Sequence, residues 1–396
     1  MRIGIDARLY GITCGTGIGR YTEELIRALG SLDTDNDYVI FLRKDGFDSF
    51  TPPNERWSSV LADFRPYSLA VQTKFPRVIR DAKIDLMHFT HFDHPLAYRG
   101  RFLTTIHDLI LLHHPTTRAS TLGPLKFWIK YLAYRVILCH AARSSRLVLT
   151  PSNAVRDAVM EHFHLTSDRV RATHLGIDHH KMLENGELMV DSGELIVEDI
   201  TQLSTINSQL STPYLLYVGN AYPHKNLEQL IRVARTLAHE TPHVQVVIVG
   251  REDDFSHKLR NCNPPNVIFA GAVTNHALNV LYTNATAYVS MSREEGFDIP
   301  TVEALSHGTP VIASDIPVHR EILGTAAQFV PIDDDAALVN AIHRTVLNRN
   351  ICATMSTDCA QQYTWRECAQ QTLSAYRTVY EFRHAHDEST HRGATT

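Results

Sequence analysis

The chain has 396 residues, of which 44% are hydrophobic and 20% charged, and its formal net charge is −5. Its length favours two domains with full hydrophobic cores, and its composition excludes a disordered chain. The acidic balance, with a pI near 6.5, argues against a general nucleic-acid-binding protein, because such proteins usually carry a basic excess. The six cysteines contain no CxxC pair, so neither a zinc ribbon nor a disulfide framework is indicated.

The chain opens on an apolar strand, residues 2–6, without a charged and then apolar signal segment. No run of 18 apolar residues follows. With its cysteine usage, this predicts a reduced, cytoplasmic setting for a protein that is neither secreted through a classical signal nor membrane-spanning.

Two halves of the sequence share one pattern, in which short apolar runs alternate with helical stretches. In the first half the candidate strands are residues 3–7, 37–42, 86–89, 102–106 and 147–151. In the second half they are residues 214–218, 244–250, 267–270, 286–290, 310–313 and 328–330. Such alternation is typical of parallel sheets covered by helices on both faces, so the sequence predicts an α/β protein with two Rossmann-like domains.

Composition indicates the domain boundaries. We assign residues 1–178 to the first domain and residues 213–362 to the second. Residues 179–212 contain six acidic residues and a single lysine, which indicates a linker with an exposed acidic insertion. A closing helix is predicted over residues 363–384, with its pattern clearest at 365–382, and residues 385–396 form a polar tail that we expect to fray.

A glycine cluster, Gly15, Gly17 and Gly19, precedes a predicted helix at residues 20–29. Close approach of backbone to a phosphate or a sugar is sterically feasible at such a site. The cluster is not the dinucleotide-binding fingerprint, because the positions that would need a third small residue hold Arg20 and Thr22. A mobile surface turn is the alternative interpretation.

His107 directly follows an apolar strand, which predicts that it lies at the carboxyl end of that strand, where ligands collect in parallel sheets. With 23 histidines in the chain, position alone does not make this one functional. The neighbouring Asp108 either orients the imidazole or caps the next segment.

A basic, aromatic stretch covers residues 118–146. It has six basic residues and no acidic ones, interleaved with Phe127, Trp128, Tyr131 and Tyr134. Such a helix either lies on an anionic membrane surface or packs its aromatic rings into the first domain and exposes its lysines to solvent. The first interpretation would make the protein peripheral to the inner face of the membrane.

Lys225 lies between a predicted strand and a helix that begins near Asn226. A cation next to a helix N-terminus can neutralise a pyrophosphate, so stabilising a leaving group is the expected role of this lysine.

Two glutamates, Glu295 and Glu303, lie eight positions apart across a turn that opens a short helix over residues 302–307, with Pro300 in the first turn. Free N–H groups at a helix start suit a phosphate, whereas carboxylates prefer hydroxyl groups. A nucleotide sugar offers both, so the segment predicts an activated-sugar site. The alternative is that these are ordinary acids of a helix start.

Together these segments resemble the retaining nucleotide-sugar glycosyltransferases of family 4, which have the two-domain GT-B architecture. The matching segments are Gly15–Arg20, Thr105–Asp108, Thr150–Asn153, Leu175–Asp178, Tyr217–Asn226 and Glu295–Glu303. The resemblance implies parallel sheets that face an interdomain cleft, a nucleotide-sugar donor held by the second domain, and a last helix that crosses back to the first.

The resemblance also implies site residues. Catalytic roles fall to His107, Lys225 and Glu295, with His107 and Glu295 at the transferred sugar. The donor-binding positions are Gly15, Gly17, Asn220, Lys225, Arg251, Val273, Glu295, Gly296, Phe297 and Glu303, with Glu303 at the ribose hydroxyls. Asn220 stands where the family commonly has an arginine, which puts a second phosphate-binding cation in doubt, and protonated His224 or Arg251 are the candidates to replace it.

We expect no metal and no cofactor. The run Asp333–Asp335 lies in a predicted helix start and is therefore not expected to hold a metal ion. We expect Lys225 and backbone amides to stabilise the negative charge of the leaving diphosphate instead. The expected activity is transfer of a hexose, most plausibly mannose from GDP-mannose, to a glycan or lipid-linked oligosaccharide with retention. The alternatives are glucosyl, rhamnosyl or N-acetylhexosaminyl transfer, an epimerase or phosphorylase on the same architecture, or a non-catalytic sugar-nucleotide-binding subunit.

Overall fold

The computed structural model describes residues 1–11, 17–115, 124–177, 213–251, 254–260, 264–347 and 356–392. The chain divides into two compact units. The first consists of Met1–Leu112, Pro124–Gly176 and Trp365–Thr396, and the second of His113–Gly123 and Ile177–Thr364. The predicted acidic linker at 179–212 lies outside the described residues.

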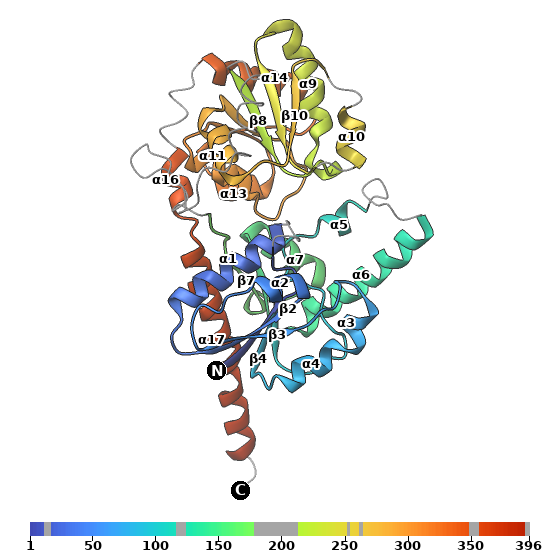
Figure 1. The fold of residues 1–396 in the computed structure, drawn as a ribbon, viewed down its shortest axis with the longest axis vertical. Helices are drawn as coiled ribbons and strands as arrows, with labels where there is room; N and C mark the ends of the chain where they lie inside the picture. The colour runs from blue at the N-terminus through green and yellow to red at the C-terminus, as the bar shows by residue number, and fades with distance from the viewer. Residues whose placement is uncertain are drawn as a thin grey trace. The chain divides into compact units, whose positions relative to one another are not determined.

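The first unit is built on a seven-stranded parallel sheet with the order β3-β2-β1-β4-β5-β6-β7 (Figure 1). Its strands are β1 (Arg2–Ala7), β2 (Asp37–Leu42), β3 (Trp57–Leu61), β4 (Leu86–Phe89), β5 (Phe102–Thr105), β6 (Leu147–Thr150) and β7 (Val170–Ala172). The sequence did not predict β3 and β7, which are the two edge strands. Each pairs on one side only, and β3 is only partly buried, so neither shows the continuous apolar run of a central strand.

The helices of this unit are α1 (Gly17–Leu32), α2 (Lys44–Ser49), α3 (Leu69–Thr73), α4 (Phe75–Asp81), α5 (Ile110–His113), α6 (Pro124–Ser144), α7 (Asn153–Phe163) and α17 (Trp365–Arg392), with the 3-10 turn η1 (Ser167–Arg169). β4 shows how they cover both faces of the sheet. Met87 and Phe89 share a buried cluster with Phe75 of α4, whereas His88 projects from the opposite face and places its Nδ1 2.8 Å from the Tyr376 hydroxyl of α17.

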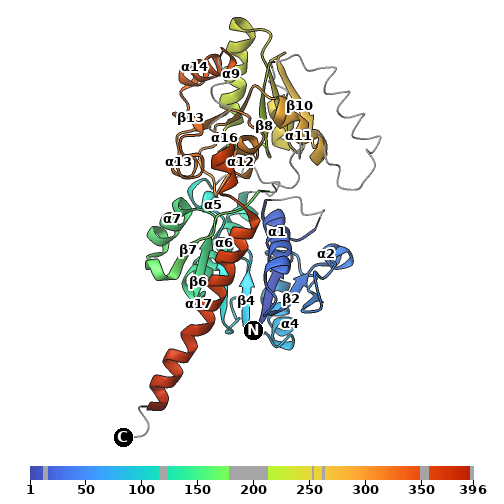
Figure 2. The same ribbon diagram turned by 90° about the vertical axis from the view of Figure 1, so that its left-hand side faces the viewer.

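The closing helix α17 packs beside α1 in both views (Figures 1 and 2). It extends to Arg392, beyond the predicted end at residue 384 and into the predicted polar tail. The fraying of that tail stays a prediction.

The second unit contains a six-stranded parallel sheet with the order β10-β9-β8-β11-β12-β13. Its strands are β8 (Tyr214–Val218), β9 (Gln245–Val249), β10 (Val267–Gly271), β11 (Ala287–Ser290), β12 (Val311–Ser314) and β13 (Ala327–Val330). The helices are α9 (Leu227–Glu240), α10 (Asp254–Arg260), α11 (Asn275–Asn284), α12 (Ile299–Ser306), α13 (Pro317–Leu323), α14 (Asp335–Leu347) and α16 (Ser356–Gln361), with the 3-10 turn η3 (Pro223–Lys225). All six strands were predicted, and the prediction of two parallel α/β sheets is confirmed.

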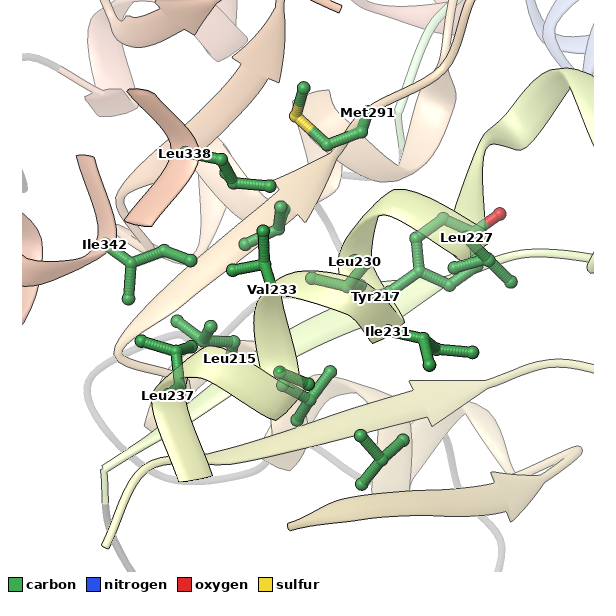
Figure 3. Packing of buried hydrophobic residues seen from close by; sticks show 14 of the residues in the cluster. Leu215, Tyr217, Leu227, Leu230, Ile231, Val233, Leu237, Met291, Leu338 and Ile342 are labelled. Carbon is green, nitrogen blue, oxygen red and sulfur yellow. The ribbon is translucent and has the colours of Figure 1, made fainter. Parts of the chain in front are cut away.

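One face of this sheet is covered by α9 and α14. Figure 3 shows their leucines and isoleucines pointing at the apolar side chains of β8. In α9, Leu230, Val233 and Leu237 are spaced three or four residues apart and so lie on one side of the helix, where all are buried. Burying a side chain of this kind contributes about 1.5–3 kcal/mol, so the packing of α9 fixes where the loop ahead of it ends.

Glycines end the first three strands of the second sheet. Gly219 follows β8 with φ +149°, a conformation that favours glycine. A Cβ atom at Gly250, after β9, would lie 2.1 Å from the Gly219 carbonyl oxygen. Glycine is therefore required at Gly250, at this carboxyl edge.

In the basic helix α6, Phe127 and Tyr134 are buried, as one of the two interpretations requires. Trp128, Ile129, Leu132 and Val136 are nonetheless 51–62% exposed, which that interpretation does not explain. In the described part of the chain, no helix combines the length and apolar character needed to cross a membrane.

Candidate active site

Lys225 and Glu295 meet at the carboxyl edge of the second sheet. Lys225 ends the η3 turn that follows β8, and Glu295 stands in the loop after β11. These two strands are neighbours at the point where the strand order reverses, which is where open α/β sheets bind ligands. The Lys225 Nζ lies 2.5 Å from Glu295 Oε1, so the two residues predicted to act together do lie together.

The electrostatics of this pair come from burial and from a second carboxylate. Burial lowers the pKa of Lys225, but the charges of Glu295 and Asp298 outweigh it, and the pKa is raised. Burial raises the pKa of the Glu295 carboxyl, and Lys225 opposes that change. A contact this short in a nearly buried place is that of an ammonium and a carboxylate, and we therefore take both groups as charged at neutral pH.

Asp298 and His319 form a second buried pair that the sequence reasoning missed. The Asp298 Oδ2 accepts hydrogen bonds from Ser290 Oγ at 2.7 Å and from His319 Nε2 at 3.1 Å. His319 Nδ1 donates to the Ser314 carbonyl at 2.9 Å, so both ring nitrogens carry protons. Burial would lower the pKa of His319, but the bond to Asp298 raises it, and the same bond overcomes burial to lower the pKa of Asp298.

Asp298 also sets the backbone at the start of α12. It is the N-cap residue, with φ 65° and ψ 65°, a left-handed conformation that aspartate tolerates better than most residues. The only sequence signal was a charged residue in an otherwise apolar turn, and its partner lies 21 positions away. Local pattern could not supply that pairing.

The start of α12 is the predicted anion site. Pro300 lies in its first turn, where a missing N–H costs no hydrogen bond, and the remaining first-turn N–H groups carry the positive end of the helix dipole. Gly296 and Phe297 lead into this turn. The Phe297 ring is 3% exposed and packs edge-on against Tyr363, with 5.3 Å between ring centroids, so its side chain anchors the loop while its amide remains the part predicted to meet a ligand.

Glu303 lies on α12, and its Oε2 accepts a hydrogen bond from the Tyr282 hydroxyl at 3.1 Å. Tyr282 is buried at the end of α11. The contact holds one oxygen of Glu303 in place and leaves the carboxylate partly exposed, as a residue that accepts hydroxyl groups requires.

The other predicted donor-binding residues stand in loops at the same edge: Asn220 after β8, Arg251 after β9 and Val273 after β10. Arg251 is exposed. His224 does not fit the role of a second cation in the free protein, because burial and the charge of Lys225 lower its pKa to about 3. Of the two candidates to replace the family arginine, Arg251 remains.

The carboxyl edge of the first sheet holds a different buried cation, which sequence reasoning also missed. Arg8 follows β1 and is 3% exposed. Its Nε and Nη2 donate to the Asp6 carboxylate at 2.9 and 2.8 Å, and Nη2 lies 3.5 Å from an Asp93 oxygen. In the described structure Arg8 Nη1 and Asp93 Oδ1 are buried without a hydrogen-bond partner. A charged residue directly after a buried strand was the available signal.

His107 follows β5 at this edge, as predicted. Its Nε2 donates to the Thr90 carbonyl at 2.9 Å, and its ring packs edge-on against Tyr21 at 4.8 Å. Burial lowers the pKa of His107 to about 4. The imidazole is therefore neutral at pH 7, and its Nδ1 is an acceptor rather than a donor.

Asp108 accepts a hydrogen bond from the Ile110 amide at 3.0 Å. This contact is the capping role, one of the two interpretations offered for it.

Gly17 is the exposed first residue of α1, so the helix begins earlier than the predicted residue 20. Gly15 lies outside the described residues.

The aspartates of the run after β13 form ion pairs and a hydrogen bond within the second unit. Asp333 pairs with Arg293 at 2.7 Å, Asp334 accepts the Ala337 amide at 2.9 Å, and Asp335 pairs with Arg232 at 2.9 Å. The predicted helix start at this run is confirmed. Within the described ranges, no group of three or more histidine, cysteine or acidic side chains is arranged to hold a metal ion.

Two parallel Rossmann-like units, with paired ions and a helix start at the carboxyl edge of the second, define a protein of the GT-B class. The family model named Glycosyltransferase Family 4 matches residues 15–181, and the model named Glycosyl transferases group 1 matches residues 201–362. The chain belongs to these group 1, family 4 glycosyltransferases.

Individual relatives are distant but cover most of the chain. The O-antigen chain mannosyltransferase B of Escherichia coli is 26% identical over 92% of this chain and 96% of its own length. The O-antigen chain mannosyltransferase RfbU of Salmonella typhimurium is 26% identical over 83% of this chain and 86% of its own.

Solved structures share the fold at lower identity. A sucrose-phosphate synthase from Thermosynechococcus elongatus superposes with a TM-score of 0.71 at 19% identity, covering 96% of this chain and 99% of the other. HepE from Anabaena, solved in complex with UDP-glucose, gives a TM-score of 0.69 at 17% identity, covering 96% and 100%.

Proposed function

We propose that this glycosyltransferase transfers mannose from GDP-mannose to a glycan or lipid-linked saccharide acceptor, with retention of the anomeric configuration. The observation that carries the proposal is the Lys225–Glu295 ion pair at the switch point of the second sheet. It supplies one cation for a diphosphate and one carboxylate for sugar hydroxyls, next to the first turn of α12.

In this mechanism the bond between the sugar and the diphosphate breaks through an oxocarbenium-like state, and negative charge accumulates on the departing diphosphate. Lys225 and the first-turn N–H groups of α12 stabilise that charge. The ion pair of the free protein keeps Lys225 fixed and charged, so the ammonium is already in place when the diphosphate arrives. Glu295 then accepts hydroxyl groups of the sugar, and Glu303 those of the ribose.

His107 takes a supporting role. Because its imidazole is neutral and donates through Nε2 to Thr90, it would accept a hydrogen bond from a sugar hydroxyl through Nδ1 rather than transfer a proton. The predicted contact with the transferred sugar is compatible with this tautomer.

Mannose is favoured because the two relatives that match most of this chain are named mannosyltransferases. The structures that share the fold include one solved with UDP-glucose, so the fold alone does not choose the donor. Glucosyl, rhamnosyl and N-acetylhexosaminyl transfer are the alternatives within the same mechanism.

The proposal of a lipid-linked acceptor depends on the surface of α6. Its exposed row of Trp128, Ile129, Leu132 and Val136 stands among the exposed basic residues Lys126, Lys130 and Arg135. An exposed apolar row with basic neighbours suits an anionic membrane surface, and a lipid-linked acceptor would be reached there. Flotation with anionic vesicles at low salt tests this point, and a chain that stays unbound would remove the lipid-surface part of the proposal.

The test of the activity is a donor panel of GDP-mannose, UDP-glucose, dTDP-rhamnose and UDP-N-acetylglucosamine, read by donor hydrolysis and by transfer to an oligosaccharide extract. We expect GDP-mannose to be consumed fastest, and Lys225→Ala and Glu295→Ala to lose that turnover. Lys44→Ala, which breaks an exposed pair with Asp48 at 3.3 Å, is the matched control and should retain it.

The remaining alternative is a non-catalytic sugar-nucleotide-binding subunit. It is worth testing because Asn220 stands where the family commonly has an arginine. It predicts a thermal shift with GDP-mannose but no turnover with any acceptor. Wild-type turnover equal to that of Lys225→Ala would exclude the proposed mechanism.

A further inference from the structure

A cavity with several arginines in its wall lies in the first unit. It has a volume of about 540 Å³ and is bounded by the residues that precede β5, β6 and β7 and by α17. It therefore lies at the amino edge of the sheet, opposite to the carboxyl edge that carries Arg8 and His107. We call it the arginine pocket.

Five arginines line it, Arg99, Arg101, Arg143, Arg146 and Arg169, against the single carboxylate Asp168. Arg169 is fixed by the fold, since its guanidinium donates to the carbonyl oxygens of Arg143 and Ser145 at 3.1 and 2.5 Å. Those carbonyls are at the C-terminal end of α6, so this contact caps the helix. The capping arginine rigidly positions the segment from which Arg143 and Arg146 project.

Arg143 and Arg146 themselves are exposed, and neither forms an ion pair with another described residue. Arg99 donates to the carbonyls of Leu96 and Tyr98, and among the described residues no carboxylate pairs with it. Like charges held close together repel one another unless an anion is added.

A neighbouring histidine lies within the influence of Arg99. His140, which also lines the pocket, places its Nδ1 2.8 Å from His94 Nε2. Burial and the charge of Arg99 lower the pKa of His140. Burial disfavours a charge of either sign, but the contribution of Arg99 is that of a positive field, which disfavours an added proton and favours an anion.

We propose that the arginine pocket is a second ligand site of this protein, which binds a phosphate group and is separate from the nucleotide-sugar site. Guanidinium groups form paired hydrogen bonds to phosphate oxygens, and a cavity of this size lies within the range of small-molecule sites, about 300–1,000 Å³. Two sources of phosphate are chemically equivalent here: a soluble phosphate or pyrophosphate, and the headgroup of an anionic lipid.

The lipid source has one structural argument of its own. Val136, His140 and Arg143 are spaced four and three residues apart, so they follow one side of α6. The exposed apolar row of that helix therefore leads to the pocket, as an amphiphilic ligand would require.

The test compares the full chain with the double variant Arg143→Gln/Arg146→Gln. Calorimetric titration with inorganic pyrophosphate, with saturating GDP present to occupy the donor site, measures the soluble source. Flotation with phosphatidylcholine vesicles, with and without phosphatidylglycerol, measures the lipid source. We expect the double variant to bind one of these probes about 10–100-fold more weakly, because two charge-assisted contacts are lost and solvent screening at these exposed positions weakens each of them.

Arg77→Gln/Arg80→Gln is the matched control, since both arginines are exposed on α4 of the same unit. It should bind as the wild type does. Arg143→Lys/Arg146→Lys keeps the charge without the paired donors and should fall between, which separates a guanidinium site from general attraction. Equal binding by the Gln variant and the wild type, or an equal loss in the α4 control, would overturn the proposal, as would no binding of either probe.

Discussion

Buried histidines of the two units are in opposite charge states. In the first unit, burial lowers the pKa of His88 to about 3 and of His107 to about 4, so both are neutral. In the second, His319 is at least as buried, but Asp298 raises its pKa. The difference is one carboxylate 3.1 Å from the ring, so the charge state of a buried histidine follows its neighbour and not its depth.

The two buried cations differ in a similar way. Arg8 is 3% exposed and held by Asp6 through two hydrogen bonds. The Lys225 side chain is 21% exposed and has one short contact, to Glu295. We infer that Arg8 mainly stabilises the first unit, whereas Lys225 remains accessible to a ligand.

The largest expected effect follows from breaking the Asp298–His319 pair. Asp298→Ala leaves a charged imidazole buried without its partner and puts alanine in a left-handed conformation. We expect a loss of about 3–5 kcal/mol of unfolding free energy, measured by denaturant titration. Asp298→Asn keeps a hydrogen-bond acceptor for His319, and asparagine tolerates the left-handed conformation, so this variant should lose clearly less unfolding free energy. Equal stability of the alanine variant and the wild type would contradict the assigned pair.

The next effect separates the two cations. Lys225→Met should lower turnover about 10²–10³-fold, the usual effect of removing one transition-state donor, while the chain remains folded. Arg8→Met should instead lower the unfolding free energy, because it strands the buried carboxylates Asp6 and Asp93. Circular dichroism melts and steady-state kinetics on both variants make the comparison. Loss of folding in Lys225→Met together with normal stability in Arg8→Met would reverse it.

A smaller effect is expected at Glu303. Glu303→Gln removes a charged acceptor and should weaken donor binding by about 1.5–3 kcal/mol, with little change in turnover at saturating donor. Tyr282→Phe, which removes only the hydroxyl that orients Glu303, is the control and should cost less. Calorimetric titration with GDP decides between them, and unchanged affinity in Glu303→Gln would remove the ribose assignment.

The opposite histidine charges predict opposite pH dependences. The folded pKa of His88 lies below the unfolded value of about 6.5, so stability is lost as pH falls from 6.5 toward 3. The folded pKa of His319 lies above the unfolded value, so its contribution is present below pH 6.5 and is lost as pH rises through the folded pKa.

Melting temperatures from pH 4 to 9 test this. His319→Asn should destabilise more at pH 6 than at pH 9, and His88→Gln should flatten the acid side of the curve. Each kcal/mol corresponds to about 2–4 °C for domains of this size. Parallel curves for both variants and the wild type would refute the assigned charge states.

The sequence predicted best those features that depend on the residues of a single element. The central strands, the helix at α9 and the start of α12 follow from apolar runs, glycines and a proline, so their positions were predicted to within a few residues. Lys225 and Glu295 were found because each lies in the turn between a buried strand and the next helix, and the carboxyl ends of neighbouring parallel strands meet at one edge.

The missed features are those that two distant segments make together. The edge strand β3 is recognisable only beside β2, and His319 acquires its role from Asp298, 21 positions earlier. The arginine pocket gathers residues from before three strands and from α17, which no local pattern connects. His224 shows a related effect, because burial and the charge of Lys225 lower the pKa of its imidazole, which the sequence alone does not reveal.

The most direct test of the Lys225–Glu295 site is a crystal structure of the protein with GDP-mannose or GDP bound. A diphosphate oxygen should lie within hydrogen-bond distance of Lys225 Nζ, in front of the first turn of α12, with the ribose hydroxyls at Glu303. A diphosphate bound elsewhere, with the Lys225–Glu295 pair unchanged and unliganded, would contradict the account.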